Sequence, residues 1–197
     1  MNNYKQLLLG VRSYSFDYND IFPASLPAGM TVTGSVMHWP NFLWKEDNSG
    51  SYVGWKSLVC PSLQIHPDKN IWYCNGMLGY LGNVTTFAQN NYGKSSYLYT
   101  SSPRISLINF KGMISASRFP IFSDTKRFGN DSKYPVTFYA PNQPNTDDAK
   151  HYSPSLHHRS TGMIGFADGH TASYGHSWYA KEGFGYVNIE GVHTRFQ

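Results

Sequence analysis

The sequence begins with one helical segment and shows no long helical period from residue 30 onward. In residues 2–19, apolar and aromatic side chains recur at three- and four-residue spacing, with polar side chains between them. Positions with this spacing share one face of an α-helix, so the segment is predicted to be an amphipathic helix. Pro23 and Pro27 indicate that the helix ends and a loop begins. The positions on the predicted apolar face are Tyr4, Leu7, Leu8, Val11, Tyr14, Ser15 and Tyr18.

From residue 30 onward, short runs of β-branched and aromatic residues alternate with Pro, Gly and Asn, which is typical of strands separated by turns. A short helix is also expected in 39–44 or 84–90, and 140–156 is expected to be an exposed loop. One helix that leads into many strands predicts an α+β fold with a mainly antiparallel sheet and long loops. The expected strands are 30–37, 52–60, 71–80, 96–100, 105–110, 118–123, 136–139, 162–167 and 170–174.

The pair Asp168-Gly169 stands between the last two predicted strands. Asp and Gly tolerate positive φ, so this pair is a strong signal for a two-residue hairpin turn. The Asp168 carboxylate is expected to accept hydrogen bonds from nearby backbone amides. The strand pairs in such a hairpin are Ala167 with His170, Phe166 with Thr171 and Ile164 with Ser173.

This register assigns the hairpin side chains to two faces. Ile164 and Phe166 are expected to face the core, because alternate residues of a strand share one face. Gly165, Ala167 and His170 are expected on the opposite face. Gly165 and Ala167 are small enough for another element to pack closely over them.

The composition permits a real core but provides few charges. Hydrophobic residues make up 40% of the chain and charged residues 14%, which is well below the usual quarter. A surface covered mainly by uncharged polar residues is typical of extracellular β-rich proteins. The net charge is +4, and the largest basic cluster is Lys126-Arg127, so a nucleic-acid partner is not expected.

Two cysteines, Cys60 and Cys74, leave two readings open. Their spacing does not form a zinc motif, which needs about four ligands at short spacings. In an exported chain they can form a disulfide worth roughly 3 kcal/mol. In a reducing compartment they are two small apolar side chains.

The sequence contains no membrane or export signal of its own. No run approaches the roughly 18 apolar residues of a spanning helix. No basic region followed by an apolar core marks a signal peptide. Taken alone, this favours a cytosolic protein, but the argument does not hold for a chain that has lost an N-terminal piece.

Four motifs resemble one known family. His158 stands ten positions before Asp168, and residues 166–170 read Phe-Ala-Asp-Gly-His. This resembles the His-x9-Asp-Gly motif of prepilin-type, pseudopilin-like proteins related to type II secretion in planctomycete and lentisphaeral bacteria. Three further stretches are similar to family motifs and follow the family order. They are Asn3-Tyr4-Lys5-Gln6-Leu7 with Tyr14 and Phe22-Pro23, Leu58-Val59-Cys60-Pro61-Ser62, and Arg104-Ile105-Ser106-Leu107-Ile108 followed by Pro120-Ile121-Phe122-Ser123-Asp124.

The resemblance implies a pilin-like fold in which an N-terminal helix packs on an antiparallel sheet. Residues 1–197 would form a single head domain, with 1–20 as the C-terminal half of a longer helix and 30–197 as the β-rich head. The family carries a cleaved leader and about twenty apolar residues ahead of this point. The resemblance therefore implies that a membrane anchor is missing and that Met1 is an artificial start.

The resemblance also implies a function and a location. The chain would be a non-enzymatic subunit of a type II secretion or type IV pilus-related assembly, anchored to the inner membrane, with its head in the periplasm or outside the cell. Its partners would be other pseudopilin subunits, which contact it through the N-terminal helix, and the membrane. The motif residues would be structural, and His158 would bond the turn or a neighbouring loop. These motif residues are His158, Phe166, Asp168, Gly169 and His170.

A metal site is the main chemical alternative to a structural role. His157, His158, Asp168, His170 and His176 lie within twenty residues, and imidazole and carboxylate groups suit zinc. No two of them form a short motif such as His-Glu-x-x-His. The candidate ligands are His158, Asp168, His170 and Asp124. No cofactor is expected, although calcium is an alternative at Asp124 or at residues 147–148.

Other activities have less support in the residues. The chain has no Gly-x-Ser-x-Gly nucleophile elbow and no glycine-rich phosphate loop. Its many aromatic residues favour a carbohydrate-binding surface protein as the first alternative function, provided that several lie exposed in a row. A metal-dependent hydrolase that uses the C-terminal His and Asp residues is the second alternative.

Overall fold

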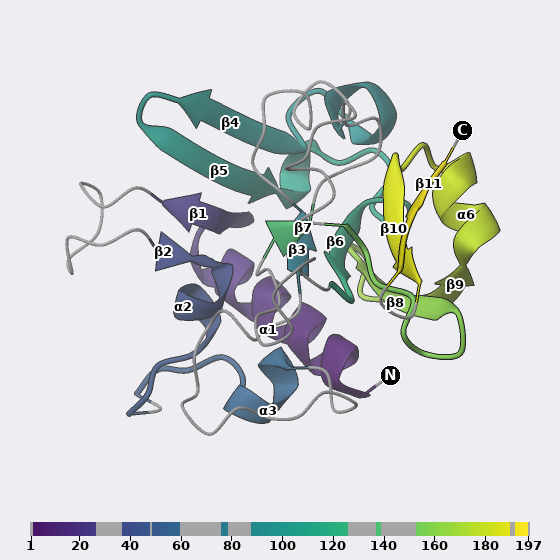
Figure 1. The fold of residues 1–197 in the computed structure, drawn as a ribbon. Helices are drawn as coiled ribbons and strands as arrows, with labels where there is room; N and C mark the ends of the chain where they lie inside the picture. Colours follow the sequence, from purple (N-terminus) through teal and green to yellow (C-terminus); the bar gives the residue numbers. More distant parts are fainter. Residues whose placement is uncertain are drawn as a thin grey trace.

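The computed structural model describes residues 2–26, 37–47, 49–59, 76–78, 88–125, 137–138, 153–189 and 192–196. Within these residues, helices accompany three sheets whose strands pair almost entirely in the antiparallel sense (Figure 1). The fold is therefore α+β, as the sequence predicts. No helix among the described residues is both long enough and apolar enough to cross a membrane.

Helix α1 (Asn2–Asp17) confirms the predicted N-terminal helix. Tyr4, Leu7, Leu8 and Val11 are buried, so the predicted apolar face is the one that enters the core. The helix contacts strand β1 (Ile21–Leu26) of one larger sheet, and strands β6 (Pro120–Ser123) and β8 (Thr161–Phe166) of the other. It is therefore the element that joins the two sheets into one core.

The first sheet has the strand order β2-β1-β5-β4 and is antiparallel throughout. Its strands are β1 (Ile21–Leu26), β2 (Met37–His38), β4 (Tyr97–Ser101) and β5 (Arg104–Asn109). Strands β4 and β5 confirm two predictions, and they project together from one side of the molecule (Figure 1). The expectation of a loop directly after the helix was wrong, because β1 pairs with β5 despite Pro23.

The second sheet has the order β7-β3-β6-β8-β9, with only the β3–β7 pair parallel among the described strands. Its strands are β3 (Gly76–Leu78), β6 (Pro120–Ser123), β7 (Thr137–Phe138), β8 (Thr161–Phe166) and β9 (Thr171–Gly175). Each lies within or close to a predicted strand. A separate hairpin of β10 (Tyr186–Ile189) and β11 (Val192–Arg195) was not predicted.

Helix α1 and the short helix α6 (His176–Lys181) lie on opposite faces of strand β8. A Cβ atom added at Gly165 would lie 3.1 Å from Leu8 Cδ1 of α1. A Cβ atom added at Gly162 would lie 2.8 Å from the Tyr179 hydroxyl of α6. The prediction that another element packs closely over Gly165 is therefore confirmed, and that element is α1.

The final hairpin differs from the prediction by one residue. Phe166 N donates to His170 O (3.0 Å) and Gly169 N donates to Phe166 O (3.0 Å). With Gly169 at φ 94°, this is a three-residue loop made of a tight turn and a left-handed glycine. Ile164 consequently pairs with Ala172 instead of Ser173.

The changed register moves one side chain to the other face. His170 was expected on the face away from Phe166, but its ring stacks on Phe166 at 4.2 Å with an interplanar angle of 5°. Ile164 and Phe166 are buried as predicted. Ala167 is buried as well.

Helices α2 and α3 test two predictions, of which the first was correct and the second was wrong. Helix α2 (Trp39–Leu43) confirms the helix expected in 39–44, and residues 88–92 are helical where 84–90 was the alternative. Residues 55–58, expected within a strand, form helix α3 (Trp55–Leu58) instead. The Asn3 side chain of α1 donates to the Lys56 and Val59 carbonyls, which provides these groups at the end of α3 with partners.

Part of the segment expected to be an exposed loop is buried. Ser153, Ser155 and Leu156 are at most 2% exposed. Ser155 N donates to Asp124 O (2.7 Å), and Leu156 N donates to Asn188 O (2.6 Å). Residues 153–156 therefore run between the end of β6 and β10. The rest of the predicted loop lies outside the described residues.

Candidate functional site

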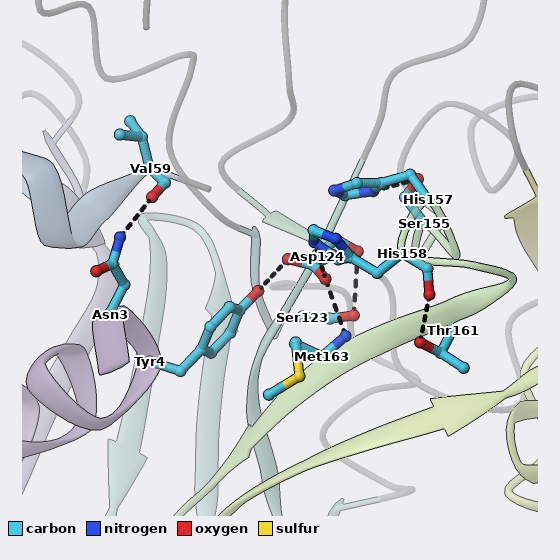
Figure 2. Close-up of polar contacts among 10 residues, drawn as sticks. All are labelled: Asn3, Tyr4, Val59, Ser123, Asp124, Ser155, His157, His158, Thr161 and Met163. Atoms are coloured by element: carbon cyan, nitrogen blue, oxygen red, sulfur yellow. Dashed lines mark hydrogen bonds and ion pairs between the residues drawn. The ribbon is translucent and has the colours of Figure 1, made fainter. Parts of the chain in front are cut away.

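Asp124 lies immediately after β6, and its side chain is buried. The Tyr4 hydroxyl of α1 donates to Oδ1 (2.9 Å), and the Met163 backbone N–H of β8 donates to Oδ2 (2.9 Å) (Figure 2). Hydrogen bonds of this kind compensate a buried carboxylate for its loss of water. Asp124 thus ties the N-terminal helix to two strands of the second sheet.

His158 completes the surroundings of the Asp124 carboxylate. Its Nε2 atom lies 3.5 Å from Asp124 Oδ2. The ring is only partly buried, with 31% of the side chain exposed, so one side of this pair faces the surface. The His158 side chain thus contacts the residue that follows β6, whereas the Asp168 carboxylate of the hairpin turn interacts with His170.

A tight turn positions His158 at the start of β8. His158 N donates to Thr161 O and Thr161 N donates to His158 O, both at 3.1 Å. The two central residues, Arg159 and Ser160, have φ of 51° and 60°. Positive φ at both central positions is the geometry of a type I′ turn, which Asn and Gly occupy far more readily than Arg and Ser. The chain thus adopts a conformation that its own residues disfavour at this point.

His157 brings a second imidazole to the same place. Its ring centroid lies 4.2 Å from that of His158, and its Nδ1 atom lies 3.1 Å from the Ser155 hydroxyl. Asp124, His157 and His158 each offer one ligand atom, and these three atoms lie within 4.8 Å of one another. Figure 2 shows both rings on the side of Asp124 away from Tyr4. We call these three residues the His-Asp cluster.

Asp168 and His170 are not part of this cluster. They face each other at the exposed hairpin turn, where His170 Nδ1 lies 2.6 Å from Asp168 Oδ1 and His170 N donates to the same oxygen (3.1 Å). The structure therefore separates the four sequence candidates for metal binding into two pairs, His158 with Asp124 and Asp168 with His170. Asp168 does accept a backbone amide, as predicted.

The pKa of Asp168 is lower than its ordinary value of 3.8. Partial desolvation alone would raise this pKa. The hydrogen bonds from the backbone and the ring of His170 favour the charged carboxylate and outweigh that effect. Asp168 is thus a turn residue whose ionised form is stabilised by His170.

Several sequence candidates lie outside the described residues. These are both cysteines of the possible disulfide, Cys60 and Cys74, and the acidic pair at 147–148. His176 is described, and its ring lies 4.5 Å from that of Phe196, away from the His-Asp cluster.

Sequence reasoning missed the connection between Tyr4 and Asp124. The periodicity of α1 correctly placed Tyr4 on the buried face but treated it as an ordinary core residue. Its partner is 120 positions away, so no local spacing could signal the hydrogen bond. The available signal was that both residues belong to family-like motifs, as does His158.

The outer face of α1 carries a second feature of interest. Leu9 is 68% exposed and Phe16 is 85% exposed. They are seven residues apart, which places them on one line along the helix, roughly opposite the buried face. Leu9 and Phe16 thus give the outer face of the helix two large exposed apolar side chains, with polar residues between them.

Comparison of the chain with protein-family models, with curated proteins and with solved structures found no match.

Proposed function

We propose that the chain is the head of a non-enzymatic, pseudopilin-like subunit in a cell-envelope assembly related to type II secretion or type IV pili. In this proposal an apolar segment ahead of α1 holds the subunit in the inner membrane. The head then lies in the periplasm or outside the cell. Neighbouring subunits contact it through α1.

The observation that carries the proposal is that α1 has apolar side chains on two opposite faces. One face of the helix is buried against both larger sheets, and the opposite face exposes Leu9 and Phe16. A helix that packs only on its own core typically has polar side chains on its outer face, so two large apolar side chains exposed there support a second contact. A helix that also packs against helices of neighbouring subunits needs both faces.

The polar motif residues support a structural role for this region. Tyr4, Met163 and His158 surround the Asp124 carboxylate, and the acceptor positions they occupy are used within the fold. The second motif pair, Asp168 and His170, stabilises a turn. Both arrangements hold the head together, which is what an assembly subunit requires of its motifs.

Among the residues that the structure describes, the feature that would favour the carbohydrate-binding alternative is not found. Such a surface needs a row of exposed tryptophan and tyrosine side chains. Among the described tryptophans, Trp39 and Trp44 are buried, and Trp55 and Trp178 are half-buried. No observation in the described residues therefore places this alternative ahead of the assembly subunit.

The proposal is tested by photo-crosslinking from the outer face of α1. A photoreactive phenylalanine analogue replaces Leu9 in the full-length protein, expressed in cells that contain the rest of the assembly. Irradiation is expected to link it to α1 of another pilin-like subunit, identified by mass spectrometry. The matched control carries the analogue at Ile114, which is 84% exposed but lies outside α1.

The result has two clear outcomes. Adducts to pilin-like subunits from position 9, but not from position 114, support assembly through α1. Equal labelling at both positions, or no pilin-like partner at position 9, means that the exposed face of α1 is not an assembly surface and the proposal fails.

A further inference from the structure

We propose that Asp124, His157 and His158 bind one divalent transition-metal ion, with zinc as the best match, at the junction of α1, β6 and β8. The proposal goes beyond the assembly function and does not depend on it. The sequence candidates for a metal site included Asp168 and His170, which the structure places at a separate turn. The site proposed here contains neither of them.

The chemistry of the cluster selects the class of ion. Two imidazoles and one carboxylate are a common ligand set for zinc and related first-row metals. Calcium and magnesium prefer oxygen ligands, and calcium takes six to eight of them. A cluster with two nitrogen donors and one carboxylate therefore favours zinc over calcium.

The distances fit a tetrahedral ion after a small closure. Zinc binds nitrogen and oxygen at roughly 2.0–2.1 Å, so two ligand atoms at a tetrahedral angle stand about 3.3 Å apart. His158 Nε2 and Asp124 Oδ2 are already 3.5 Å apart. All three ligand atoms lie within 4.8 Å of one another, so His157 must approach by at most about 1.5 Å. A water molecule supplies the fourth ligand in this proposal.

The groups around the cluster act as outer-shell partners would. Metal-bound carboxylates are normally fixed by further hydrogen bonds. Asp124 has such bonds from the Tyr4 hydroxyl and the Met163 backbone. The Ser155 hydroxyl lies beside Nδ1 of His157 and can hold the orientation of that ring. The buried ligand, Asp124, is thus the one held by two hydrogen bonds from other elements.

The backbone around the two histidines provides an independent reason. Arg159 and Ser160 occupy the left-handed region, which costs free energy in non-glycine residues. Such conformations persist where the surrounding structure requires them, often at binding sites. This turn directs His158 back toward Asp124, and both imidazoles are partly exposed.

The test uses untagged protein stripped with a chelator and then titrated with zinc. We expect one zinc ion per chain and a rise in melting temperature of roughly 5–10 °C at a free zinc concentration about 100 times the dissociation constant. Calcium at the same concentration is expected to produce no such shift. Binding of cobalt(II) should give the visible absorption of a tetrahedral nitrogen and oxygen site.

Two histidine variants locate the site. His157→Gln is expected to weaken zinc binding by at least about tenfold, whereas His170→Gln at the hairpin turn leaves it unchanged. A loss of binding in His170→Gln but not in His157→Gln would move the site to the turn and overturn the proposal. The absence of any saturable zinc effect in the wild-type protein would overturn it as well.

A measurement on the unaltered chain guards against a variant that does not fold. Imidazole nitrogen resonances of the wild-type protein are recorded by NMR with and without zinc. The proposal requires the ring signals of His157 and His158 to shift together at one equivalent, while those of His170 and His176 stay in place. Shifts spread over all four rings would indicate adventitious binding and contradict the site.

Discussion

At the scale of single residues, Asp124 is the most informative side chain of this protein. It is 1% exposed, and its carboxylate accepts hydrogen bonds from α1 and β8 while facing His158. A buried carboxylate that loses one of its partners keeps the cost of its burial. Loss of one hydrogen-bond partner of Asp124 is therefore expected to lower stability more than loss of an exposed hydroxyl or amide.

The first prediction concerns the Tyr4 hydroxyl. Tyr4→Phe keeps the ring in the core but removes one hydrogen-bond donor from the buried Asp124 side chain. We expect the free energy of unfolding to fall by about 1.5–3 kcal/mol in urea denaturation. Tyr18→Phe, directly after the end of the helix, serves as the control, because Tyr18 is 55% exposed, and it should change stability by less than about 0.5 kcal/mol. Equal effects in the two variants would mean that the Tyr4 hydroxyl adds nothing specific.

The second prediction concerns acid stability at the hairpin turn. The pKa of Asp168 is lowered in the folded protein, so its contribution to stability is present above the unfolded value of about 3.8 and is lost as pH falls through the lower folded value. Stability is measured for the wild type and Asp168→Asn from about pH 5 to pH 2. The difference between the two should shrink toward zero at the acid end. A difference that stays constant over this range would exclude the charge of Asp168 as its cause.

At the scale of elements, strand β8 lies between α1 on one face and α6 with residues 155–156 on the other. It has glycine at the point of closest approach on each face. Gly165 admits Tyr4 and Leu8, and Gly162 admits the Ser155 carbonyl and the Tyr179 hydroxyl. The elements that pack against β8 thus restrict which residues it can contain, in addition to its pairing with β6 and β9.

The third prediction follows from the contact at Gly165. A valine there would place its Cβ 3.1 Å from Leu8 Cδ1 and 3.2 Å from Tyr4 Cδ1, with two further methyl groups to accommodate. We expect Gly165→Val to lower the free energy of unfolding by about 2–3 kcal/mol, since α1 must move away from the strand. Gly54→Val, where an added Cβ meets nothing within 4 Å, should cost less than about 1 kcal/mol. Chemical denaturation of both variants makes the comparison.

The elements that could be predicted from sequence are those whose pattern is local. The apolar spacing of α1 and the bounded apolar runs at β4, β5, β6 and β8 identified these elements correctly. In each of them, local propensity and tertiary burial favour the same conformation.

The elements that were mispredicted depend on distant contacts. Residues 55–58 resemble a strand in isolation but form α3, whose end is bonded by Asn3. Residues 153–156 look like a polar loop but are buried by pairing with Asn188 and Asp124. The His-Asp cluster was only partly predicted for the same reason, since the partner of the two histidines lies more than thirty positions away.

At the scale of the whole molecule, the N-terminal helix is bonded to residues far along the chain. The hydrogen bond from Tyr4 to Asp124 spans 120 positions, and the Asn3 and Gln6 side chains reach α3 across more than 50. Contacts over such sequence separations cost loop-closure entropy, which the other contacts of the folded chain must offset. The β-rich part of the chain is therefore not a domain to which α1 is merely attached.

The fourth prediction is that removal of residues 2–17 abolishes cooperative unfolding. Without α1, the apolar residues packed against it on both sheets, such as Phe122, would be exposed to water. Calorimetry of the shortened protein should show no sharp transition. The contrasting variant is Leu9→Ser with Phe16→Ser, on the outer face, which should shift the melting temperature by no more than about 2 °C. A sharp transition in the shortened protein would show that the rest of the chain folds without α1.

The bond between Tyr4 and Asp124 has a mechanical consequence. A pull along the axis of α1 is transmitted within its first turn to the end of β6 and the middle of β8, because the hydroxyl and the carboxylate couple them directly. Tension therefore acts on the interior of the second sheet and does not first extend a slack tether. If the helix is drawn in one direction, the globular part must follow as a rigid body or lose its tertiary structure.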